Sequence, residues 1–282
     1  MHWLTCRPHA RLIVFARIVG TAAQRERRSE TARIHPRRVG RRDNTQRRVA
    51  GMDNGTRDEL IGSLVEAIES VAIPHPTRVA IDGPPAAGKT TLAGELAVVL
   101  RARGRDVIHA SIDEFLFPRA RRYRRGEYSA DACYHDAFDF DALHQVLLDP
   151  LGPGGNRRFQ RAVYDQSTDT SLARQLTTAS PDTVLLFDGV FLMRPELLDR
   201  WDLRIFVSVA FEETLERARI RDLAKNGSIA EVERRFRYRY IPSQQHYNAT
   251  IRPTDHADII VHNNEPRQPS WETRPRPSTT QE

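Results

Sequence analysis

The pattern of apolar and polar positions divides residues 57–261 into two kinds of segment that alternate along the chain. Short runs rich in apolar and β-branched residues predict strands buried on both faces of a sheet. They cover residues 78–82, 105–112, 183–187, 203–209 and 257–261. Apolar residues spaced three or four apart predict helices. They cover residues 57–71, 90–100, 138–148, 211–225 and 229–240. This alternation predicts an α/β fold with about five parallel strands and helices on both faces.

A glycine-rich loop joins the first predicted strand to a helix. Residues 83–90 read G-P-P-A-A-G-K-T and fit the pattern G-x-x-x-x-G-K-[ST]. Between a strand and a helix this pattern predicts a phosphate-binding loop, because backbone N–H groups and the helix N-terminus attract anions. The fold class that we expect is therefore the P-loop NTPase fold, with ATP as the ligand. The loop residues expected to bind ATP are Gly83, Pro84, Pro85, Ala86, Ala87, Gly88, Lys89, Thr90 and Thr91.

Two acids follow predicted strands at the edge of the sheet where this loop lies. Asp113 follows residues 105–112, and Asp188 follows residues 183–187. We expect Lys89 to contact the β- and γ-phosphates, and Thr90 and Asp188 to bind Mg²⁺. Asp113 is predicted to accept a proton from an attacking hydroxyl and to help hold the metal. Helix capping is the alternative role for either acid.

The predicted helices at residues 211–225 and 229–240 carry several arginines. They are Arg217, Arg219, Arg221, Arg234, Arg235, Arg237 and Arg239. Arginines near a transferring phosphoryl group stabilise its negative charge, although a run of arginines is more often a solvated face. We expect one or two of them to contact phosphate, with Arg217 and Arg221 as the candidates.

Charge is distributed unevenly. Residues 1–51 hold 13 arginines, no lysine and three acids, which gives +10 and leaves −4 on the rest of a chain whose total is +6. The basic balance is therefore no evidence that the folded body binds nucleic acid. We expect residues 1–51 to be disordered, as a basic arm, a transit peptide or a translated leader upstream of Met52. We expect a kinase domain over residues 52–263 and a disordered tail over residues 264–282.

The two cysteines, Cys6 and Cys133, are too few for a disulfide framework or a metal cluster. Such usage suits a reducing cytosol, so we expect a cytoplasmic protein. No apolar stretch approaches the roughly 20 residues that cross a bilayer. We accordingly expect no membrane partner, and we leave a homo-oligomer open.

Several segments, in order, resemble the uridine kinase and phosphoribulokinase group of P-loop kinases. They are residues 79–83, 113–115, 135–139, 163–165, 186–191, 202–207 and 217–222. The resemblance spans about residues 77–263. It implies that Asp113 is the catalytic base, that Asp188 replaces a magnesium-linked glutamate, and that the arginines belong to a lid. It also implies that Tyr164 and Asp165 border a nucleoside site.

This sequence departs from the uridine kinases at two places in the pocket for the nucleoside. Cys133, Tyr134 and His135 stand where those enzymes have an acid followed by His-Pro, and Asp169 stands at the place of a histidine. Tyr164, Asp165 and Asp169 are nevertheless the residues that we expect to bind substrate. For Tyr164 the alternative is a half-buried tyrosine at the end of a strand.

The leading hypothesis is an ATP- and Mg²⁺-dependent kinase that phosphorylates a hydroxyl of a nucleoside such as uridine or cytidine. One alternative is a kinase for another alcohol, such as a pantothenate-like or sugar-phosphate acceptor. The other is a nucleotide-binding regulatory or nucleic-acid-associated protein that phosphorylates no acceptor. The acidic body argues against nucleic acid as the partner.

Overall fold

The computed structural model describes residues 52–274. The disorder expected for residues 1–51 concerns a segment outside the described residues, as do residues 275–282 of the expected tail. Among the helices of residues 52–274, none combines the length and the apolar character needed to cross a bilayer.

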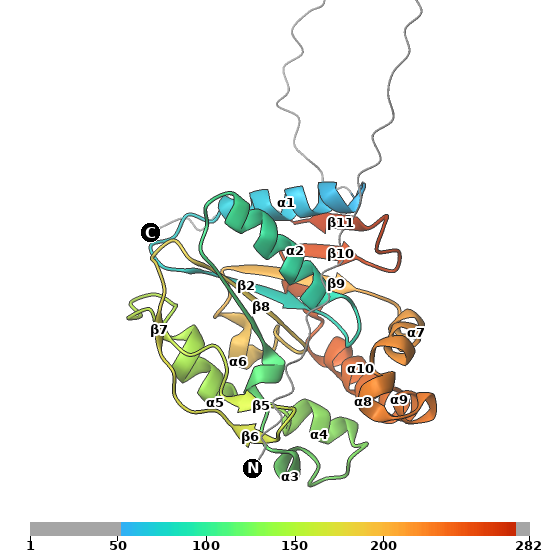
Figure 1. Ribbon diagram of the computed structural model, residues 1–282. Coiled ribbons are helices and arrows are strands. Elements are labelled where there is room, and N and C mark those ends of the chain that lie inside the picture. Colours follow the sequence, from blue (N-terminus) through green and yellow to red (C-terminus); the bar gives the residue numbers. More distant parts are fainter. Residues whose placement is uncertain (1–51, 275–282) are drawn as a thin grey trace, which may run out of the picture. The chain divides into compact units, whose positions relative to one another are not determined.

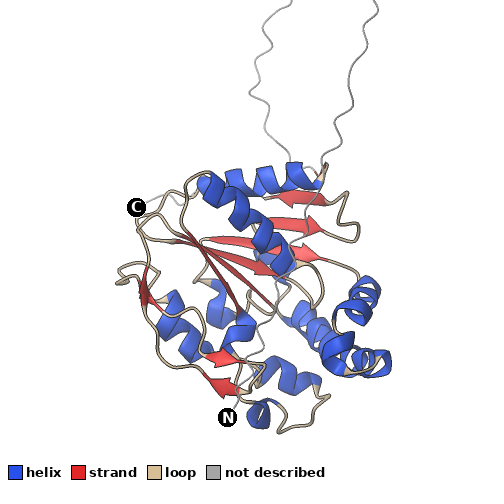
Figure 2. Cartoon of the chain, in the orientation of Figure 1, coloured by secondary structure: helices blue, strands red, loops and turns tan. Residues whose placement is uncertain are grey.

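A seven-stranded sheet lies at the centre of the described part (Figures 1 and 2). Its strands are β1 (Met52–Asn54), β2 (Thr77–Asp82), β3 (Val107–Ser111), β8 (Val184–Gly189), β9 (Leu203–Ser208), β10 (Ile259–His262) and β11 (Ser270–Thr273). They are ordered β1-β11-β10-β9-β2-β8-β3. The five strands from β10 to β3 are parallel, which confirms the predicted sheet, and β11 and β1 extend it in antiparallel fashion.

The expectation that residues 264–282 are disordered is wrong for the part that the structure describes. Ser270–Thr273 pair with β10, and Val261 lies opposite Trp271. Trp271 is buried in the apolar cluster that also holds Leu64 and Leu96. Burial of this indole outweighs the polar, proline-containing composition that argued for disorder.

Helices cover both faces of the sheet, as predicted (Figure 1). On one face lie α1 (Arg57–Glu69) and α2 (Lys89–Ala102), which pack on Val79 and Ile81 of β2. The opposite face meets the helices α4 (Ala130–His135), α5 (Phe140–Leu143), α6 (Pro195–Leu198) and α10 (Ile241–Thr250). Ala80 of β2 points into that second cluster, so successive residues of one strand serve opposite faces.

The remaining elements connect these strands and helices. They are a 3-10 turn (Ile112–Phe115), α3 (Arg119–Arg122), a π turn (His144–Leu148), α7 (Phe211–Arg221), α8 (Leu223–Asn226), α9 (Ile229–Arg235), a second π turn (Phe236–Tyr240) and α11 (Pro253–His256). Two small ribbons pair β4 (Arg158–Phe159) with β7 (Thr177–Thr178), and β5 (Tyr164–Asp165) with β6 (Thr170–Ser171). In Figure 1, α7, α8 and α9 form a helical group beside α10.

Helix boundaries follow local chemistry where the sequence supplies it. Thr56 caps α1, accepting a hydrogen bond from the Glu59 backbone while the Glu59 side chain returns to the Thr56 N–H. The helix expected to end near residue 240 instead continues through the π turn into α10. Pro242 follows directly on the π turn, where the regular pattern of helix hydrogen bonds is already interrupted because the Ile241 N–H bonds to Phe236 five residues back.

Replacing Trp271 tests whether β11 is part of the stable domain. Trp271→Ala removes a buried indole, and we expect it to lower the free energy of unfolding by about 3 kcal/mol. Urea unfolding followed by far-UV circular dichroism measures the change. The control is Val98→Ala at an exposed site on α2, where we expect a change within about 0.5 kcal/mol. Equal small effects of both substitutions would contradict the assignment of β11 to the core.

Candidate active site

The glycine loop between β2 and α2 has the close approaches and backbone angles that the motif requires. Gly83 lies so near β9 that a side chain there would collide with the carbonyl oxygen of Val207. Gly88 adopts a φ of 94°, a left-handed conformation that favours glycine, just before α2 begins at Lys89. The free N–H groups at the start of α2 therefore face the loop, which suits a bound phosphate chain.

Lys89 is buried at the centre of the site. Its ammonium donates to the carbonyl oxygen of Pro84 at 2.8 Å. Burial lowers the pKa of Lys89, and the negative charges of Asp188, Asp82 and Asp113 oppose that shift. A buried ammonium has lost its hydration, so it is suited to bind a phosphate group, which carries more negative charge than a carboxylate.

Asp82 is a site residue that the sequence analysis missed, although it directly precedes the glycine loop. Its fully buried carboxylate accepts the N–H of Gly83 at 2.7 Å and the hydroxyl of Tyr247 at 2.5 Å. The Tyr247 oxygen in turn accepts the N–H of Met193 at 2.9 Å. Burial raises the pKa of Asp82. This chain of hydrogen bonds fixes the start of the loop to α10.

Thr90 and Asp188 meet at the end of β8. The Thr90 hydroxyl donates to Asp188 at 2.8 Å, and the other carboxylate oxygen of Asp188 lies 2.8 Å from Nε2 of His109. A hydroxyl beside a carboxylate offers the hard oxygen ligands that Mg²⁺ prefers. Residues 52–274 contain no cluster of three acidic, histidine or cysteine ligands, so Mg²⁺ would also need phosphate or water oxygens.

Asp113 opens into the same cavity as the loop. It lies in the 3-10 turn after β3, which Ser111 and Glu114 cap reciprocally. The cavity, of about 340 Å³, is lined by Lys89, Thr90 and Asp188 together with Asp113. Enclosure by its walls raises the pKa of Asp113, while Lys225 and Lys89 lower it. These four predicted residues thus share one cavity, and their catalytic roles stay predictions.

Arg217 and Arg221 lie beside the glycine loop, on α7. Arg221 lines both this cavity and a second one of about 660 Å³ that reaches Gly88 and Thr91. Its guanidinium forms two hydrogen bonds with Asp222. Arg217 lines the second cavity and donates to the carbonyl oxygens of Asn263 and Asn264. The second cavity therefore adjoins the glycine loop on the side of α7.

The expected substrate residues Tyr164, Asp165 and Asp169 lie outside the walls of the cavity that holds Asp113. The Tyr164 hydroxyl donates to Asp169, whose carboxylate also accepts the N–H of Arg119. Asp165 accepts hydrogen bonds from Ser167 and Thr168 within its own turn. These residues hold the segments that carry Arg119 and Gln166, which do line the cavity. Direct contact of Tyr164, Asp165 or Asp169 with a substrate stays a prediction.

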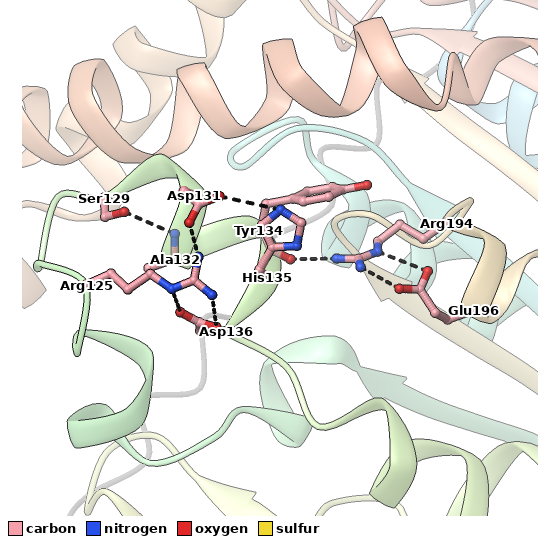
Figure 3. Close-up of polar contacts among 9 residues, drawn as sticks. All are labelled: Arg125, Ser129, Asp131, Ala132, Tyr134, His135, Asp136, Arg194 and Glu196. Atoms are coloured by element: carbon pink, nitrogen blue, oxygen red, sulfur yellow. Dashed lines mark hydrogen bonds and ion pairs between the residues drawn. The ribbon is translucent and has the colours of Figure 1, made fainter.

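Helix α4 carries the departure at Cys133, Tyr134 and His135 and presents Cys133 to the cavity. Figure 3 shows how the helix is held. Arg194 donates to the carbonyl oxygen of Tyr134 at 2.6 Å and forms an ion pair with Glu196. On the other side, Arg125 forms ion pairs with Asp131 and Asp136. These contacts fix α4 on both sides and thereby hold the Cys133 thiol in the wall of the cavity.

A phosphate loop, a buried lysine, a Thr–Asp pair and an aspartate in one cavity define the class of P-loop phosphotransferases that act on a hydroxyl. The sequence pattern of the Phosphoribulokinase / Uridine kinase family matches residues 79–268, which is most of the described domain. The chain therefore belongs to the Phosphoribulokinase / Uridine kinase family.

Curated relatives agree with this membership, and a solved structure shares the fold. The chain is 29% identical over 189 residues to a uridine kinase of Chlamydia pneumoniae, covering 66% of this chain and 81% of that protein. It is 27% identical over 190 residues to uridine-cytidine kinase B of Dictyostelium discoideum, covering 66% and 74%. A solved structure described as a possible uridine kinase from Bacillus stearothermophilus shares the fold, with a TM-score of 0.57. Its sequence is 24% identical, and the match covers 72% of this chain and 97% of that one.

Removing the carboxylate charge of Asp188 tests the Mg²⁺ assignment. We expect Mg²⁺ to strengthen binding of a fluorescent ATP analogue by at least tenfold, because a metal held by Thr90 and Asp188 would neutralise phosphate charge. Asp188→Asn should lose most of that gain and keep the affinity measured in EDTA. Fluorescence titration with and without Mg²⁺ gives both values.

The matched control is Asp106→Asn, because Asp106 accepts a hydrogen bond from Ser180 and does not line the cavity. It should behave as the unsubstituted protein does. A full Mg²⁺ effect in Asp188→Asn would remove Asp188 from the metal site.

Proposed function

We propose that the protein is an ATP-dependent kinase that transfers the γ-phosphate to a hydroxyl of a small molecule, with nucleosides such as uridine and cytidine as the first acceptors to test. One observation carries the proposal: Lys89, Thr90, Asp113 and Asp188 line a single cavity beside the phosphate loop. Phosphoryl transfer needs a positioned nucleophile and neutralised phosphate charge, and these residues supply both.

The residues divide the reaction between them. Asp113 takes the proton of the acceptor hydroxyl while the hydroxyl oxygen forms a bond to the γ-phosphorus. The bond from that phosphorus to the bridging oxygen of the β-phosphate breaks, and ADP leaves with the electron pair. Lys89 and Arg221, both in the cavity wall, offset the negative charge that develops.

Magnesium fits the oxygen ligands of Thr90 and Asp188, and when bound it would neutralise charge on the β- and γ-phosphates. The position of Asp188 is fixed independently of the metal by Thr90 and by His109. The proposed acceptor therefore approaches a site in which the carboxylate of Asp188 is already oriented.

The choice of acceptor draws on separate observations. Names of the relatives, such as uridine kinase and uridine-cytidine kinase, support a nucleoside. Cations such as Arg122 and Arg239 line the cavity and favour an alcohol that carries an anionic group. A regulatory protein without an acceptor would not need Asp113 beside the phosphate loop. The free thiol of Cys133 accords with a cytoplasmic location, which we also propose.

Replacing Asp113 tests the assignment of the base. Asp113→Asn keeps the size of the side chain but does not accept the proton, so we expect turnover to fall by about 10²–10⁴-fold. The affinity for ATP should stay unchanged. Transfer of labelled phosphate to an acceptor panel measures the first value, and calorimetry measures the second. Exposed Asp149→Asn is the control, and an active Asp113→Asn would remove Asp113 from the mechanism.

The pH dependence of the reaction follows from the raised pKa of Asp113. Asp113 must be ionised to accept a proton, so kcat/KM should fall as the pH drops through a pKa above the ordinary aspartate value of 3.8. Lys225 favours the ionised form. Lys225→Gln should therefore move the acid limb to higher pH, whereas Lys225→Arg should leave it in place. Identical acid limbs in both variants would contradict this electrostatic coupling.

A further inference from the structure

Part of the cavity wall is formed by arginines of α3, α9 and the second π turn, and two of them, Arg122 and Arg239, have few carboxylate partners. We call this part the acceptor end and define it by Arg122, Cys133, Arg235, Arg239 and Gln244, all of which line the cavity with Asp113. The proposed mechanism uses none of these five side chains. Their chemistry bears on which alcohol the kinase phosphorylates.

Arg239 is a buried guanidinium, 3% exposed, whose hydrogen bonds go to neutral groups. It donates to the carbonyl oxygens of Glu127 at 3.2 Å and Ser129 at 3.0 Å, and it lies 5.0 Å from the centre of the Tyr123 ring. Within residues 52–274, no carboxylate forms an ion pair with it. A buried charge without a counter-ion is costly, so a bound anion would be strongly favoured there.

Arg122 in α3 is likewise a buried guanidinium whose hydrogen bonds go to neutral groups. It is 5% exposed and donates to the carbonyl oxygen of Phe117 at 2.6 Å and to the Tyr164 hydroxyl at 3.4 Å. Its ion pair with Asp169 is long, at 3.9 Å, and the same Asp169 oxygen accepts the Tyr164 hydroxyl. Arg122 thus keeps donors that face the cavity and are only weakly paired.

The side chains between these two arginines are neutral. Burial raises the pKa of the Cys133 thiol, with Arg239 and Arg122 opposing and Asp113 adding to the shift, so all three charges lie around this sulfur. Gln244, 2% exposed, has an amide nitrogen without a hydrogen-bond partner. An unsatisfied buried donor beside buried cations points to a ligand with acceptor oxygens.

The carboxylate of Glu127 does not neutralise Arg122 and Arg239. Glu127 lines the cavity, but its carboxylate pairs with Arg235. Arg235 also pairs with Glu231. Arg122 and Arg239 therefore keep an excess positive charge at the acceptor end.

We propose that the acceptor is an alcohol that carries a phosphate or carboxylate group, and that Arg239 and Arg122 bind this anion while Gln244 donates to one of its oxygens. The hydroxyl to be phosphorylated then faces Asp113. The inference rests on the proposed kinase function and specifies its substrate class. Arginine suits this role because its planar donors match the oxygens of both anions.

Matched acceptors test the substrate class on the unsubstituted protein. Labelled ATP is offered with ribose and ribose 5-phosphate, glycerol and glycerate, and pantothenol and pantothenate, together with uridine and cytidine. We expect kcat/KM for an anionic member of a pair to exceed that of its neutral partner by at least 100-fold. The pair with the greatest ratio tells whether the anion is a phosphate or a carboxylate.

A binding measurement that needs no turnover tests the residues. With the phosphate loop filled by Mg²⁺ and a non-hydrolysable ATP analogue, inorganic phosphate is titrated into the protein by calorimetry. We expect one phosphate to bind, and Arg239→Gln to weaken it by at least tenfold. The control is Arg237→Gln, since Arg237 lies in the same π turn but is exposed and pairs with Glu233.

The outcomes separate this inference from the proposed function. Efficient transfer to uridine or cytidine, with anionic alcohols used poorly, would leave the kinase intact and overturn the anionic acceptor. Phosphate binding that is absent, or equal in Arg239→Gln and Arg237→Gln, would overturn the assigned residues even if no acceptor turns over. Failure to bind ATP would instead contradict the kinase itself. Circular dichroism of Arg239→Gln checks that the fold is retained.

Discussion

One buried ammonium depends on three carboxylates for its charge, and the arrangement of the domain follows from that constraint. The negative charges of Asp188, Asp82 and Asp113 favour the charged form of Lys89. Each of these acids ends or follows a different parallel strand. These acids can surround one cation because parallel strands bring their carboxyl ends to the same edge of a sheet. Helix α2, which packs on the sheet through its apolar face, then holds Lys89 at the point where the loop turns.

The hydrogen bonds around this cation link the two ends of the cavity. Asp82 connects the glycine loop to Tyr247 in α10, and α10 also carries Gln244 at the acceptor end. Asp188 connects Thr90 to His109 in β3, the strand that leads to Asp113. Asp82 and Asp188 therefore connect the glycine loop to α10 and to β3, the elements that carry Gln244 and lead to Asp113.

The sequence predicted the features that depend on neighbouring residues. The glycine loop, the five parallel strands and the positions of Asp113 and Asp188 follow from local patterns, and the structure brings these residues together. The bond between Asp82 and Tyr247 joins residues 165 positions apart, and β11 depends on pairing with β10. No local pattern encodes such contacts.

The arginines show the same limit at the level of single side chains. In the predicted helix at residues 229–240 they looked alike, but a π turn at Phe236–Tyr240 inserts an additional residue into the helical repeat. Arg239 is buried at the cavity, whereas Arg237 is exposed and pairs with Glu233. Residues two apart lie on opposite sides of a helix, so periodicity separates these two arginines but does not tell which of them faces the cavity.

The central claim is that a triphosphate lies in the loop at residues 83–90 and is held by Lys89. Calorimetric titration of the purified protein with Mg²⁺–ATP tests it most directly, with Lys89→Ala measured in parallel. The account predicts one binding site per chain in the unsubstituted protein and loss of that heat in Lys89→Ala. No heat from the unsubstituted protein at millimolar nucleotide, or the same heat from both proteins, would contradict it.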